Sequence, residues 1–141
     1  MFVLDTNVLS AMMRSALVPE MAAWIANQPE EELFTTAISQ AEIMAGLAVM
    51  TDGRRRASLE AAARVMFEAD FRDRILAFDN EAAAAYADIF AARRLGGRPV
   101  APLDLTIAAI AVAHDAGVVT RDTRGFEGCG LTVINPWEVH G

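Results

Sequence analysis

Short apolar runs alternate with longer segments of helical periodicity along the whole chain, with no linker, repeat or low-complexity stretch between them. Short apolar runs are typical of buried strands, and the longer segments of helices that cover a sheet. The runs predict strands at residues 2–4, 33–36, 75–78, 118–120 and 132–134. The longer segments predict helices at residues 7–14, 19–27, 38–50, 55–70, 80–95 and 103–116. We therefore predict a single α/β domain over residues 1–141.

Glycine and proline interrupt the pattern most strongly between the last two predicted helices. Gly96, Gly97, Pro99 and Pro102 all fall in this interval. Because glycine and proline end helices, the interval is predicted to be the most mobile long connection in the domain. It leads directly into the helix that carries Asp104.

The composition favours a cytoplasmic protein. Hydrophobic residues make up 54% of the chain, but much of that share is alanine within predicted helices, and no apolar run approaches the roughly 20 residues of a membrane helix. The first residues lack the basic and apolar segments of a signal peptide. Cys129 is the one cysteine, so an internal disulfide is excluded.

The net charge of -7 argues against a broadly positive surface for nucleic acid. The 12 basic residues, however, are all arginines, and several are clustered, as at Arg93, Arg94 and Arg98. The arginine fork matches phosphate geometry. The absence of lysine is better explained by a GC-rich genome, so the clustering is the part of this pattern that points to function.

Four acidic residues stand where predicted strands end or predicted helices begin: Asp5, Glu42, Asp104 and Asp122. In open α/β sheets, ligands bind beyond the carboxyl ends of the strands. Carboxylates that converge there repel one another unless a cation lies between them. A hard divalent metal with oxygen ligands is the natural candidate.

Each acid also has a purely structural explanation. Asp5 is suited to cap the first helix, and Ser39 with Glu42 matches the S-x-x-E capping box. Asp104 suits a first helical turn, and Asp122 suits a turn after a strand. Taken singly, these explanations are the better ones for every acid. Taken together, the order and placement of the four acids favour a shared site.

The ordered set resembles the PIN-domain ribonuclease family over nearly the whole chain. The residues that carry the resemblance are Asp5-Thr6-Asn7, Ser39 to Glu42, Asp104 with Ile107-Ala108-Ala109, and Thr120-Arg121-Asp122 with Phe126. The closing stretch from Gly128 to Trp137 is most similar to the VapC and FitB-like toxins of bacterial toxin-antitoxin pairs. No single motif is specific to this family, but the order and spacing of the motifs together are specific.

The resemblance implies a three-layer α/β/α sandwich with a parallel five-stranded sheet in the order 3-2-1-4-5. It also implies an acidic pocket that binds Mg2+ or Mn2+ and hydrolyses RNA to leave a 5'-phosphate. In this interpretation Asp5 and Asp104 are the main metal ligands, Glu42 is a ligand or the base that orients water, and Asp122 is an outer ligand or serves a second metal. The residues expected to hold these carboxylates in place are Thr6, Asn7, Ser39 and Thr120.

The same resemblance implies a homodimer that a small cognate antitoxin holds inactive. Apolar residues of the first two helices are candidates for an uncovered contact patch, with burial in the core as the alternative: Met12, Met13, Trp24 and Ile25. Arg93, Arg94 and Arg98 are candidates for guiding RNA past the glycine loop, with a solvated helix end as the equally weighted alternative.

The match to the family is incomplete at one position, and two rival functions exist. Gly125 stands where relatives often carry an acidic or polar residue, and the acid at the position of Asp122 is Asn in some relatives, which leaves the role of Asp122 open. A phosphatase of the haloacid dehalogenase type also begins with an aspartate after a strand, but its second aspartate is replaced here by Asn7. The other rival is a catalytically inactive partner protein whose acidic pocket receives a basic side chain.

Overall fold

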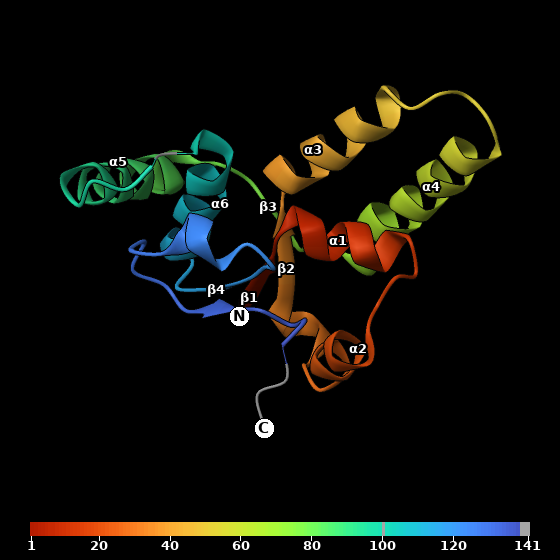
Figure 1. Ribbon diagram of the computed structural model, residues 1–141, viewed down its shortest axis with the longest axis horizontal. Helices are drawn as coiled ribbons and strands as arrows, with labels where there is room; N and C mark the ends of the chain where they lie inside the picture. The colour runs from red at the N-terminus through yellow and green to blue at the C-terminus, as the bar shows by residue number, and fades with distance from the viewer. Residues whose placement is uncertain (100, 139–141) are drawn as a thin grey trace.

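The computed structural model describes residues 1–99 and 101–138, and Figure 1 shows the arrangement of its elements. Five parallel strands form one sheet in the order β3-β2-β1-β4-β5. The strands are β1 Phe2–Leu4, β2 Leu33–Thr36, β3 Ile75–Leu76, β4 Gly117–Val119 and β5 Val133–Ile134. In the register, Val3 of the central strand lies opposite Phe34 on one side and Val118 on the other. The predicted fold class and strand order are confirmed.

In the part of the chain that the structure describes, six α-helices cover the two faces of the sheet. They are α1 Thr6–Met13, α2 Pro19–Ala26, α3 Ala37–Ala48, α4 Arg54–Val65, α5 Asn80–Leu95 and α6 Pro102–Ala113. In Figure 1, α5 and α6 lie on one side of the strands, and α1, α3 and α4 lie on the other. This arrangement gives three layers, as expected for a parallel sheet whose crossover helices cover both faces.

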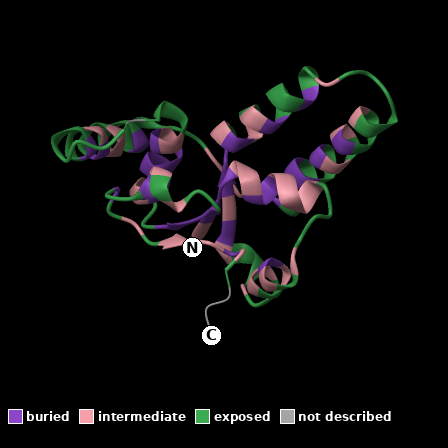
Figure 2. Ribbon diagram, in the orientation of Figure 1, coloured by how far each residue is buried: buried purple, intermediate pink, exposed green. Residues whose placement is uncertain are grey.

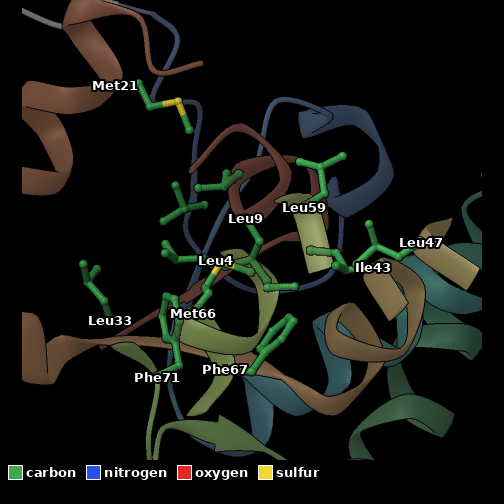
Figure 3. Close-up of a cluster of buried hydrophobic side chains, with 13 residues drawn as sticks. Leu4, Leu9, Met21, Leu33, Ile43, Leu47, Leu59, Met66, Phe67 and Phe71 are labelled. Atoms are coloured by element: carbon green, nitrogen blue, oxygen red, sulfur yellow. The ribbon is translucent and has the colours of Figure 1, made fainter. Parts of the chain in front are cut away.

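Alternation along the strands divides the core in two. Leu4 and Val119 face a cluster with α1 to α4, which Figure 3 shows around Leu9 and Met66. Their neighbours Val3 and Val118 face a second cluster with α5 and α6. Successive side chains of a strand point to opposite faces, so β1 and β4 each contribute to both clusters. Figure 2 shows the result, with buried strands between helices whose outer faces are exposed.

Helix α3 begins earlier than the capping-box interpretation requires. Its N-cap is Thr36, whose hydroxyl accepts a hydrogen bond of 3.1 Å from the backbone N–H of Ser39. Ser39 is therefore already inside the helix, and Glu42 lies too far along it to reach back to the cap. The structural explanation for Glu42 is wrong. The N-cap role of Asp5 is confirmed, because Asp5 precedes α1 and accepts from the Thr6 backbone N–H.

The other departures from the predicted elements are local. The helix predicted through residue 70 changes to a π-helical turn at Met66–Asp70. Short 3-10 turns, which the periodicity did not indicate, occur at Glu30–Glu32 (η1) and Thr123–Phe126 (η3). No helix in the described ranges is both long and apolar enough to cross a membrane.

Candidate active site

The sheet reverses its direction of winding between β1 and β4, and the candidate site lies at their carboxyl ends. From β1 the chain moves outward to β2 and β3, then crosses to β4 and β5 on the other side. Ligands of open parallel sheets bind beyond the strand ends at such a switch point. Asp5 directly follows β1, and Thr120 directly follows β4. Helix α3 directly follows β2, and α6 leads back to the start of β4, so both helices run antiparallel to the strands. Both therefore begin at the carboxyl edge of the sheet.

Asp5 is a buried carboxylate held by two hydrogen bonds. Its residue surface is only 5% exposed. The backbone N–H of Thr6 donates to Oδ1 at 2.8 Å, and the Thr120 hydroxyl donates to Oδ2 at 2.8 Å. Burial nevertheless raises the pKa of Asp5, with smaller contributions from the charges of Glu42 and Asp122, and the two hydrogen bonds only partly oppose this rise. A cation placed beside Asp5 would therefore stabilise its charged form.

The Thr120 hydroxyl connects three parts of the site. Besides donating to Asp5, it accepts from Asn7 Nδ2 at 3.1 Å and from the backbone N–H of Asp122 at 3.1 Å. The Asn7 amide in turn accepts from the backbone N–H of Arg121 at 3.2 Å. These bonds fix the turn that carries Asp122 against the start of α1. Thr120 thus contacts Asp5 directly, whereas Asn7 reaches the acids only through Thr120 and the Arg121 backbone.

Glu42 enters the site from α3 through Thr6. The Thr6 hydroxyl donates to Glu42 Oε1 at 2.9 Å. The Oγ atoms of Thr6 and Ser39 are 2.9 Å apart, so Ser39 supports the same hydroxyl. Ser39 is buried, whereas Glu42 is half-buried. One face of α3 therefore presents a held carboxylate toward the loop after β1.

Asp104 and Asp122 meet at Gly125. A Cβ atom at Gly125 would lie 2.7 Å from Asp104 Oδ2 and 3.4 Å from Asp122 Oδ2. Burial raises the pKa of Asp104, and the charges of Asp5 and Asp122 raise it further, while Arg93 lowers it. Among the described residues, none donates a hydrogen bond to the carboxylate of Asp104 or Asp122. Both side chains therefore have free oxygen atoms for a ligand.

The donor set fits Mg2+ or Mn2+, although its side chains are not gathered into a finished ligand cage. Within residues 1–99 and 101–138, no three Asp, Glu, His or Cys side chains are close enough to coordinate one ion as they stand. Mg2+ does not require this, because it usually binds through one or two carboxylates and keeps several waters. Burial is the main cause of the raised pKa values of Asp5 and Asp104, and the charges of neighbouring acids raise both further.

The three arginines predicted to guide RNA have different positions. Arg93 is 4% exposed, and its guanidinium donates to the carbonyls of Pro99, at 2.8 Å from Nη2, and of Glu127. The Arg93 guanidinium is therefore held by the protein itself, so the alternative of a solvated helix end is wrong for Arg93, and its role in guiding RNA stays a prediction. Arg94 is exposed on the last turn of α5. Arg98 is exposed and lies 3.4 Å from Glu127 Oε2.

The predicted apolar patch of the first helices is only partly present. The four residues proposed for it are half-buried, and each packs against the first core cluster: Met12, Met13, Trp24 and Ile25. More exposed apolar side chains of the described chain lie elsewhere, including Met44 of α3 and Val65 of α4.

The chain matches the PIN domain family model over residues 2–128. The chain belongs to the PIN domain family. The matched range contains all four acids and every residue that contacts them through a hydrogen bond described above.

Full-length relatives agree with this family assignment. The chain is 41% identical to a VapC ribonuclease, Y4jK, of Sinorhizobium fredii over 138 residues, which cover 98% of this chain and 99% of the relative. It is 35% identical to toxin FitB of Neisseria gonorrhoeae over 137 residues, or 97% of this chain and 99% of FitB. A solved structure of FitAB bound to an IR36 DNA fragment contains a chain that superposes with a TM-score of 0.92 at 34% identity, covering 100% of this chain and 99% of that one.

Proposed function

We propose that this PIN domain is an Mg2+- or Mn2+-dependent endoribonuclease and the toxin of a toxin-antitoxin pair. The observation that carries the proposal is the meeting of four acids from separate elements at the switch point of the sheet, where burial and mutual repulsion raise the pKa values of Asp5 and Asp104. Family membership supports nuclease chemistry, and the name of the 41% identical VapC ribonuclease supports RNA as the substrate.

The side chains have distinct roles in this proposal. Asp5 and Asp104 bind the metal, and Thr6 and Thr120 keep the Asp5 carboxylate in one orientation. Glu42, held by the Thr6 hydroxyl, orients the attacking water and accepts its proton. A bound divalent ion lowers the pKa of water and neutralises charge on the phosphate oxygens. Asp122, whose carboxylate has no hydrogen-bond donor among the described residues, serves as an outer ligand. The product carries a 5'-phosphate.

Cleavage of total cellular RNA by the purified protein, freed of any partner, tests the enzyme proposal. We expect cuts in the presence of Mg2+ or Mn2+, their loss in EDTA, and their mapping by sequencing of the new 5'-phosphate ends. Asp5→Asn and Asp104→Asn should each abolish cleavage, because each removes a charged ligand while keeping the side-chain shape. Asp88→Asn, an exposed acid on α5, is the matched control and should cleave like the parent. Cleavage that survives EDTA or either site variant would disprove a metal-dependent site here.

A small antitoxin is the proposed partner, because the 35% identical FitB is a toxin and a 28% identical solved chain belongs to a VapBC toxin-antitoxin system. An arginine or lysine from the antitoxin, placed among the four acids, would satisfy the same charges as the metal and exclude it. Co-expression with the neighbouring reading frame should abolish growth inhibition and yield a complex that does not cleave RNA. If expression of the chain alone leaves growth unchanged while purified protein cleaves RNA, the toxin assignment is wrong but the enzyme assignment remains.

We also propose that the chain works as a homodimer, as its likeness to the VapC and FitB group implies. Exposed apolar side chains such as Met44, Val49 and Val65 give the described surface candidates for such a contact. Light scattering on the purified chain should give twice the monomer mass. A monomer mass at micromolar concentration would contradict this part of the proposal.

A further inference from the structure

An arginine-rich hollow opens directly beside the candidate active site. Its volume is about 380 Å³, and its lining includes Gly125 and five charged residues: Arg93, Arg98, Asp122, Arg124 and Glu127. Two of these residues also belong to the acidic site, because Asp122 is one of the four acids and a Cβ added at Gly125 would lie 2.7 Å from Asp104 Oδ2. We call this hollow the arginine pocket. An RNA strand bound at the four acids would therefore have a neighbouring nucleotide close to the opening of the arginine pocket.

Arg93 supplies a fixed positive charge beneath the arginine pocket. Its Nε and Nη2 atoms both donate to the Pro99 carbonyl, at 3.2 Å and 2.8 Å, and its Nη1 atom donates to the Glu127 carbonyl. With its donors used in this way, the buried guanidinium is held in place and does not reach a ligand. It ties the loop before α6 to the segment after η3 and contributes a favourable field for an anion.

Arg98 and Arg124 are the arginines of the pocket that are able to contact a ligand. Arg98 is positioned over Gly128, where an added Cβ would lie 3.3 Å from Arg98 Cζ. Its interaction with Glu127 is long, at 3.4 Å, and both side chains are largely exposed, so little free energy is lost when an anion replaces Glu127. Arg124 is exposed, and its guanidinium forms no hydrogen bond or ion pair with any described residue.

We infer that the arginine pocket binds an RNA phosphodiester next to the one that is cut, with Arg98 and Arg124 as the contacting side chains. The inference rests on the proposed ribonuclease function. The phosphate fits because arginine binds phosphate oxygens through paired N–H donors. A local positive site is also required, because the net charge of -7 and the acidic cluster would otherwise repel RNA on both sides of the cut. Three arginines against Asp122 and Glu127 leave the pocket net positive.

The test uses an RNA oligonucleotide that the parent protein cleaves, under single-turnover conditions with Mg2+. We expect Arg98→Ala and Arg124→Ala each to raise the RNA concentration for half-maximal rate about tenfold, while the rate of cleavage of bound RNA stays nearly unchanged. The slope of the logarithm of the RNA binding constant against the logarithm of salt concentration should become shallower by about 0.7 for each phosphate that an arginine no longer neutralises. Arg55→Ala, an exposed arginine at the start of α4 on the other side of the sheet, is the matched control and should match the parent in both.

A second experiment identifies which phosphodiester the arginine pocket binds. The linkages on either side of the cleaved bond are replaced, one at a time, by a neutral methylphosphonate. At one linkage it should weaken binding by the parent about as much as Arg124→Ala does, and it should cause no further loss in that variant. The inference is overturned if the losses simply add at every linkage, or if both arginine variants keep the affinity and salt slope of the Arg55→Ala control. It is also overturned if the variants lose binding to the antitoxin but not to RNA, since the pocket would then hold an acidic partner segment. If the inference fails but cleavage still depends on Asp5, the proposed ribonuclease function is unaffected. If the parent protein does not cleave RNA, both the proposed function and the inference are wrong.

Discussion

The Thr120 hydroxyl donates a hydrogen bond of 2.8 Å to Asp5 Oδ2 and so joins the carboxyl ends of β4 and β1. The two residues are 115 positions apart in the chain, and Thr120 is fully buried. The same hydroxyl accepts from the side chain of Asn7 and the backbone of Asp122. One buried oxygen therefore sets the orientation of the central carboxylate and the position of the turn that carries a second acid.

Thr120→Val should lower ribonuclease activity by about 10- to 100-fold, the usual cost of losing a residue that orients a metal ligand. The substitution keeps the side-chain shape but removes the donor to Asp5 and the acceptor for two N–H groups. Stability should fall by about 1–3 kcal/mol, because buried polar groups are left without partners. Cleavage rates over a series of Mg2+ concentrations and urea unfolding measure the two effects. Thr120→Ser retains the hydroxyl and should recover most of the activity; equal losses in both variants would argue against the hydrogen bond as the cause.

Gly125→Ala should impair the site without disturbing the fold. The new Cβ would lie 2.7 Å from Asp104 Oδ2, so the carboxylate must turn away from its present position. We expect a loss of metal affinity of about tenfold or more, measured as the Mg2+ concentration for half-maximal cleavage, with unchanged circular dichroism. Gly46→Ala is the matched control, because nothing lies within 4 Å of a Cβ there and the position is inside α3. The control should gain about 0.5–1 kcal/mol of stability and cleave like the parent.

The ends of the strands were the most predictable part of the molecule. Apolar runs at β1 and β2 end at polar residues, and the structure reproduces both strands without a shift. Since parallel strands share one carboxyl edge, the sequence was sufficient to expect Asp5 near acids from other elements. The start of α3 was less predictable because Thr36 and Ser39 are both good caps, and the burial of Thr36 at the end of β2 decided between them.

The buried role of Arg93 and the need for Gly125 were not predictable from local pattern. Arg93 and Arg94 are neighbours of the same type, yet the partner that buries Arg93 is a carbonyl 34 residues away. Gly125 is required by the space that the Asp104 side chain occupies, and its own φ does not lie in the positive range. Both features depend on contacts between distant segments, which residue type and periodicity do not encode.

Leu9→Ala should destabilise the fold by about 2–5 kcal/mol. Leu9 is fully buried on α1, in the cluster of Figure 3, and its truncation leaves a cavity beneath the helix that follows Asp5. Urea unfolding at pH 7 measures the change. Leu95→Ala, at a position 90% exposed at the end of α5, should change stability by less than about 0.5 kcal/mol. A loss in Leu95→Ala similar to that in Leu9→Ala would show that burial is not the cause.

Asp104→Asn should stabilise the metal-free protein at pH 7 while abolishing cleavage. Burial and the charges of Asp5 and Asp122 raise the pKa of Asp104 above the ordinary value of 3.8, so the folded state favours the protonated form more than the unfolded state does. The penalty for the charged form is therefore absent below pH 3.8 and grows as the pH rises through the folded pKa. The stability gain of the variant should follow the same course, present at pH 7 and vanishing in acid.

Thermal unfolding in EDTA at pH 7 and near pH 4 measures this difference. Adding Mg2+ should then stabilise the parent, by about 2.7 kcal/mol at one hundred times the dissociation constant, because the ion binds the folded state alone. The variant should gain much less, since it lacks one charged ligand. Asp88→Asn should follow the parent in every condition. A variant that is no more stable than the parent at pH 7 in EDTA would mean that Asp104 is not held against like charges, and equal stabilisation of parent and variant by Mg2+ would mean that the ion does not bind at Asp104.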